Sequence, residues 1–109
     1  MSPKGLALVA MVLALSLPAR AQQLVGLRAQ GLRCLQSAGG VGCKAFLQTS
    51  HRLKNQAESA KQLRCYTALL GYEAQVLAAR SAGGSDDGAA ALALDPGFTE
   101  LQAECERIH

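Results

Sequence analysis

The sequence predicts an all-α fold: a small three-helix antiparallel arrangement stapled by two disulfides, formed after a signal peptide is cleaved. In this arrangement a long central helix is flanked by a shorter N-terminal helix and a short C-terminal helix. Apolar residues recur at steps of three and four beyond residue 22, the period of amphipathic helices. The four cysteines are an even number in a short chain, which is typical of a disulfide framework. The 109 residues allow one small domain.

Residues 1–21 have the layout of a secretory signal peptide. Lys4 supplies a basic start, residues 6–17 are almost entirely apolar, and Pro18 ends that run. Ala19 and Ala21 place small side chains where a signal peptidase needs them, so we expect cleavage after Ala21. An uncleaved signal anchor is the alternative. The apolar run is shorter than the roughly 20 residues of a membrane span, so we expect no stable membrane span after cleavage and a secreted or periplasmic protein.

Residues 22–109 are predicted to be a single helical domain. The first helix covers about 23–36 and ends at the glycine-rich segment 37–42. The long central helix covers 43–80, which contains no proline and one glycine, Gly71. A loop follows over 81–94, in which residues 89–94 could add a helical turn or two. Asp95 and Pro96 are typical of the start of the last helix.

The central segment carries two apolar stripes. The first stripe steps through Phe46, Leu53, Ala57, Ala60, Leu63, Thr67, Leu70, Ala74 and Leu77. The second lies roughly 200° away around the C-terminal half of the same helix and consists of Cys65, Leu69, Tyr72 and Val76. A helix that is apolar on two sides is expected to be sandwiched between other elements.

The cysteines are expected to pair as Cys34–Cys43 and Cys65–Cys105. Cys34 and Cys43 lie on either side of the glycine-rich turn, where two antiparallel helices face each other. Cys65 follows Cys43 by some 33 Å of helix, which is too far to face Cys34. Cys65 and Cys105 instead lie on apolar faces of the central and last helices. The two other connectivities remain alternatives. The spacing matches no common zinc, haem or thioredoxin motif, and we expect no metal and no cofactor.

The charges separate along the chain. Residues 22–80 hold eight Lys or Arg against two acidic residues, whereas residues 81–109 hold one Arg against six acidic residues. We expect the acidic end to fold back and neutralise the basic part. The alternative is that the basic 28–80 segment binds anionic ligands or membrane surfaces, with four candidate residues: Arg52, Lys54, Lys61 and Arg64.

Residue groups that would support catalysis are missing from the sequence pattern. His51 stands beside Arg52 with no neighbouring nucleophile motif, and the glycines near residue 40 lack the rest of a phosphate loop. The chain contains no Trp and few other aromatics, so we expect no nucleic-acid binding. The sequence therefore predicts an exported non-enzymatic protein, a protein–protein interaction or structural module of the envelope or secreted space with an unknown protein partner. A homodimer through exposed apolar positions of the long helix is a further alternative.

Overall fold

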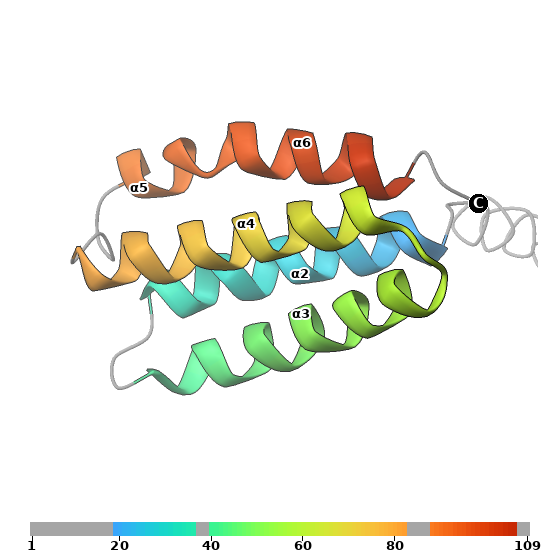
Figure 1. The fold of residues 1–109 in the computed structure, drawn as a ribbon. Helices are drawn as coiled ribbons and strands as arrows, with labels where there is room; N and C mark the ends of the chain where they lie inside the picture. The colour runs from blue at the N-terminus through green and yellow to red at the C-terminus, as the bar shows by residue number, and fades with distance from the viewer. Residues whose placement is uncertain (1–18, 37–39, 83–87, 107–109) are drawn as a thin grey trace, which may run out of the picture.

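The fold is a bundle of helices, seen in a computed structural model that describes residues 19–36, 40–82 and 88–106 (Figure 1). The helices are α2 (Ala19–Gln36), α3 (Val41–Ser59), α4 (Leu63–Ser81), α5 (Gly88–Ala93) and α6 (Asp95–Glu106). No strand occurs in these ranges. The short α5 leads into α6, so four longer helices build the bundle (Figure 1). The all-helical class is confirmed.

The prediction of one central helix over 43–80 is wrong, because the helix is broken between Ser59 and Leu63. Lys61 takes a left-handed conformation with φ of 58°. The amides of Lys61 and Gln62 donate to the carbonyls of Glu58 and Ala57, at 3.0 and 2.8 Å. This pair of hydrogen bonds is the Schellman pattern that ends helices, usually with glycine at the left-handed residue. The chain therefore reverses here, and α3 and α4 form a hairpin.

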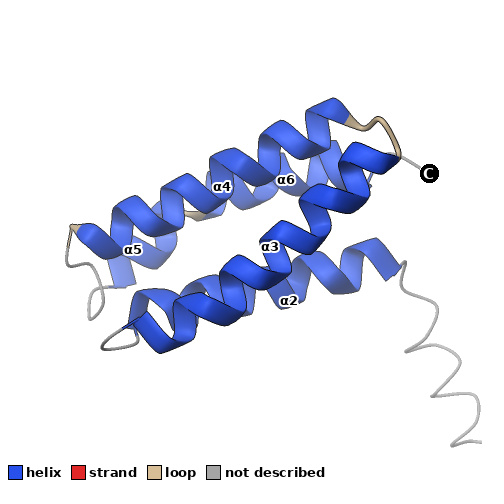
Figure 2. Cartoon of the chain, turned by 60° about the horizontal axis from the view of Figure 1, so that its bottom comes forward, coloured by secondary structure: helices blue, strands red, loops and turns tan. Residues whose placement is uncertain are grey.

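Two other boundaries complete the comparison with the sequence prediction. Within the loop expected over 81–94, the segment that could add a helical turn or two forms α5 at Gly88–Ala93. The first helix begins at Ala19, earlier than the expected start near residue 23. Residues 19–21, which precede the expected cleavage point, are therefore the first residues of α2. Residues 1–18 lie outside the described ranges, and the signal-peptide prediction is not tested there. Figure 2 shows the resulting arrangement, in which α3 crosses α2 while α4 and α6 run side by side.

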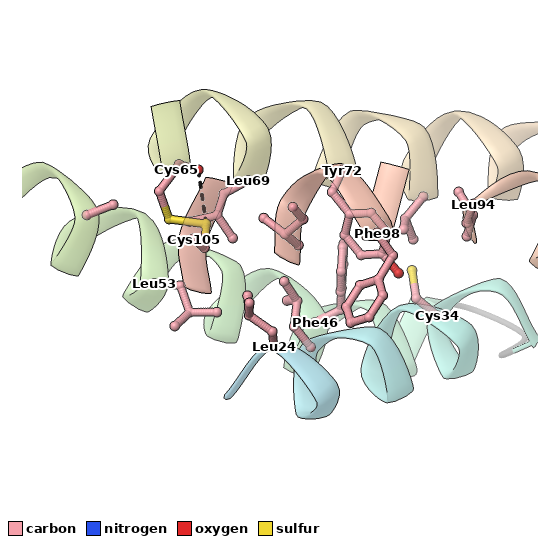
Figure 3. Packing of buried hydrophobic residues seen from close by; sticks show 14 of the residues in the cluster. Leu24, Cys34, Phe46, Leu53, Cys65, Leu69, Tyr72, Leu94, Phe98 and Cys105 are labelled. Carbon is pink, nitrogen blue, oxygen red and sulfur yellow. Dashed lines mark hydrogen bonds between the residues drawn. A yellow bond between two sulfur atoms is a disulfide. The ribbon is translucent and has the colours of Figure 1, made fainter. Parts of the chain in front are cut away.

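The core lies where all four longer helices meet (Figure 3). Three aromatic rings form its centre: Phe46 and Tyr72 have ring centroids 6.2 Å apart, and Tyr72 and Phe98 have centroids 5.9 Å apart. A side chain at Gly31 would place its Cβ 3.3 Å from the Phe46 ring, so glycine lets α2 approach closely here. Buried aliphatic residues extend the core along the bundle: Leu24, Leu27, Leu53, Leu69, Val76 and Leu101.

Both predicted disulfides are confirmed, Cys34–Cys43 and Cys65–Cys105. The first joins the end of α2 to the start of α3, and the second joins the start of α4 to the end of α6. The two bonds lie at opposite ends of the bundle. The Arg80 guanidinium near the end of α4 donates to the Cys34 carbonyl at 3.0 Å, whereas Cys65 is at the start of α4. Cys34 and Cys65 are therefore far apart, as the sequence predicts, although the chain reverses between α3 and α4.

The helix break predicts whether glycine at position 61 raises or lowers the free energy of unfolding. Replacing Lys61 with glycine is expected to raise the free energy of unfolding by roughly 1 kcal/mol, because glycine adopts the left-handed conformation without the Cβ penalty. In a continuous helix the same change would lower it by about 1 kcal/mol. Urea unfolding followed by circular dichroism measures the difference. A loss of stability in Lys61→Gly would contradict the hairpin.

Burial of Tyr72 predicts alkaline sensitivity. Burial raises the pKa of the Tyr72 phenol above its ordinary value of 10.0, nearby Arg28 opposes the rise, and Asp95 adds to it. The unfolded chain therefore releases this proton at lower pH than the folded chain. Its contribution to stability is present in full below about pH 10 and is lost as pH rises through the folded pKa.

The matched control for this pH effect is Tyr72→Phe, which keeps the ring and removes the ionisation. We expect the urea midpoint of the native chain to fall more steeply than that of Tyr72→Phe between about pH 9 and pH 11. Parallel curves for the two proteins would show that Tyr72 ionises equally in the folded and unfolded states.

Candidate functional site

Helix α4 is apolar on two sides, and the described part of the chain covers only one of them. The core side is buried and consists of Cys65, Leu69, Tyr72 and Val76. On the other side Leu63 is 71% exposed and Leu70 is 42% exposed. We call this side the outer face of α4 and define it by its exposed residues: Leu63, Thr67, Leu70, Gly71, Ala74 and Ala78.

The expectation that the central segment is sandwiched holds in part for residues 63–81: α4 lies between α3 and α6, but Leu63 and Leu70 stay exposed (Figure 1). The fully buried residues of the first stripe end at Ala57, and the second stripe supplies the core side of α4. Beyond the reversal at Lys61 the first stripe is exposed from Leu63 to Ala74, whereas Leu77 is partly buried and packs against the core. In Figure 1 no described element lies in front of α4. Among the residues that the structure describes, nothing covers the outer face, which is an apolar surface there.

A groove between α4 and α6 adjoins the outer face. It has a volume of about 480 Å³, and its lining includes Leu63, Thr67 and Gly71. On the α6 side the groove is lined by Gly97, Glu100 and Glu104. A Cβ at Gly97 would overlap the side-chain amide of Gln75, so glycine makes room for that amide in the groove. The outer face and the groove form one continuous surface, with its charges at the end near the Cys65–Cys105 bond.

The predicted anion-binding residues lie on different elements. Arg52 is exposed on α3, Lys61 is exposed in the turn, and Arg64 lines the α4–α6 groove beside two glutamates. Lys54 donates to the Glu73 carboxylate at 2.8 Å, with the two side chains 14% and 16% exposed. The hairpin creates this ion pair by bringing α4 against α3. Anion binding at these four residues stays a prediction.

One ion pair inside the molecule joins the basic part of the chain to the acidic part. The Arg28 guanidinium on α2 lies 3.3 Å from the Asp95 carboxylate at the start of α6. The same guanidinium lies over the Phe98 ring, 5.6 Å from its centroid. This pair joins the basic part of the chain to the start of the acidic last helix, and neutralisation of the acidic end as a whole stays a prediction.

Within the described ranges, no group of three or more His, Cys, Asp or Glu side chains is placed to hold a metal ion. No helix there is long and apolar enough to cross a membrane. His51 is exposed on α3 and lines a shallow surface depression with Arg52 and polar side chains. The outer face of α4 with its groove is therefore the surface that most needs a functional explanation.

Comparison with family models, curated proteins and solved structures finds no match to this chain.

Proposed function

We propose that this chain is an exported, non-enzymatic helical protein that binds another protein through the outer face of α4. The observation that carries the proposal is the uncovered side of α4, where two leucines and several small residues face solvent. Contiguous apolar patches on soluble proteins commonly mark interaction sites. The small side chains let a partner backbone approach α4 closely, and the two leucines supply apolar contact area.

The disulfides support a binding role because they fix the helix that carries the surface. Cys65 ties the start of α4 to the end of α6, and Arg80 ties the other end of α4 to the Cys34 carbonyl. A surface held in place before binding loses less conformational entropy when a partner docks. The outer face is thus presented on a rigid element.

Export is supported by the signal-like N-terminus and by the two disulfides, which persist in oxidising compartments. The secreted or periplasmic protein is expected to begin at Gln22, after removal of residues 1–21. Intact-mass measurement and N-terminal sequencing of the protein from its native host test this point. Retention of Met1, or four free thiols, would contradict export to an oxidising compartment.

The binding proposal is tested by placing a photo-crosslinking amino acid at position 70 in the secreting host. A matched control carries the same group at Val25, which is 59% exposed on α2. We expect a discrete protein adduct from position 70 and none from position 25. Equal adducts from both positions, or no adduct from position 70, would contradict a specific binding surface on α4.

A further inference from the structure

We infer that the leader, residues 1–21, is removed before the Cys65–Cys105 bond closes, because the folded and oxidised chain holds the cleavage site inside α2. This inference rests on the export in the proposed function and names the order of two covalent steps on the same chain. The first turn of α2, which carries the cleavage site, lies against this disulfide.

The peptide bond between Ala21 and Gln22 lies in a helical turn. Helix α2 begins at Ala19, so both small residues that a signal peptidase reads are helical. In an extended chain, residues two positions apart point to the same side, where a peptidase can hold both at once. In an α-helix the same two residues point about 200° apart. The folded chain therefore cannot present Ala19 and Ala21 together.

Arg20 links this turn to the rest of the bundle. Its guanidinium donates to the Cys65 sulfur at 3.7 Å, and that sulfur is bonded to Cys105 of α6 (Figure 3). In the next turn of α2, Leu24 is fully buried in the core. The ends of helices commonly open at almost no cost in free energy, but opening of this turn breaks the contact with the disulfide. The cleavage site is thus held by the bond that joins α4 to α6.

The order of the two steps determines the product. Hydrolysis adds one water across the peptide bond and leaves a carboxylate on Ala21 and an amine on Gln22. Closure of the disulfide takes two electrons and two protons from the thiols of Cys65 and Cys105 and reduces a disulfide oxidant to two thiols. A chain that is cut first loses Arg20 with the leader and then folds. A chain that is oxidised first keeps its leader.

Purified signal peptidase in detergent micelles tests this order on the full chain, oxidised or reduced. We expect the oxidised chain to be cut after Ala21 at least about tenfold more slowly than the reduced chain. Two single-disulfide variants identify the bond that protects. Cys34→Ala with Cys43→Ala keeps the Cys65–Cys105 bond and should stay protected when oxidised. Cys65→Ala with Cys105→Ala should be cut about as fast oxidised as reduced.

Arg20→Ala tests the contact itself in a chain that keeps both disulfides and the small residues at positions 19 and 21. Without the guanidinium on Cys65 the first turn of α2 should open more often, and the oxidised chain should be cut at least about threefold faster. The matched control is Arg33→Ala, an exposed arginine of the same helix, which should change the rate less than about twofold. Circular dichroism checks that both variants are folded.

The outcomes separate this inference from the proposed function. Equal cutting of the oxidised and reduced native chain would overturn the inference and leave the proposed export standing. Protection by the Cys34–Cys43 bond instead, or equal effects of the two arginine variants, would also overturn it. A native chain that is cut in neither state would contradict the cleavage site, and both the proposed export and the inference would fall with it.

Discussion

Replacing Cys65 and Cys105 together with alanine is expected to lower the free energy of unfolding by about 4 kcal/mol. The bond joins residues 40 positions apart, so its loss frees a long loop in the unfolded chain. Both side chains are fully buried, and the bond fixes the end of α6 against the start of α4. Urea unfolding of the native chain and the double variant, followed by circular dichroism, measures the change.

The control is Cys34→Ala with Cys43→Ala. That bond joins residues 9 positions apart and should contribute about 3 kcal/mol, because the loop that it closes is shorter. The Arg80 hydrogen bond to the backbone of residue 34 is retained in this control. A larger loss for the control than for the Cys65–Cys105 variant would show that loop closure does not determine the contributions of the two bonds.

Phe46→Ala is expected to lower the free energy of unfolding by about 3–5 kcal/mol, the second large effect. The ring is fully buried between Gly31 of α2 and Tyr72 of α4, so its removal leaves a cavity where three helices meet. Its sequence neighbour Leu47 is 36% exposed, and Leu47→Ala should cost less than about 1 kcal/mol. Thermal or urea unfolding compares the two variants. Similar losses would contradict the placement of the core.

The fold class and the covalent framework were predictable because they depend on spacing. Steps of three and four residues specify helices, and the Cys34–Cys43 pairing follows from the turn between them. The Cys65–Cys105 pairing was also predicted correctly, although the central helix used to infer it is broken. The prediction survives because α4 runs back along α3 and leaves Cys65 at the end of the bundle far from Cys34.

The helix break could not be predicted from local composition. Helices usually end at glycine or before proline, whereas here Lys61 takes the left-handed conformation between Ala60 and Gln62. The two stripes about 200° apart did contain a signal. One helix with two apolar sides and two helices with one apolar side each give the same pattern, and only tertiary packing distinguishes them.

The candidate site depends on this same ambiguity. The sequence identified Leu63 and Leu70 as apolar positions of a stripe, but it assigned that stripe to the interior. The hairpin leaves these two leucines exposed. The hairpin also brings Glu73 against Lys54, an ion pair between residues 19 positions apart that no local pattern predicts. Contacts created by chain reversal are thus what sequence periodicity alone could not supply.

Hydroxyl-radical footprinting of Leu63 and Leu70 tests most directly whether the outer face of α4 is an open binding surface. Dilute native protein is the starting sample, with exposed Val25 and buried Leu69 as internal references. The expected result is labelling of Leu63 and Leu70 close to that of Val25, followed by selective protection of both leucines when the partner captured at position 70 is added. Labelling of Leu70 as low as that of Leu69 in the dilute protein, or equal protection of Val25, would contradict it.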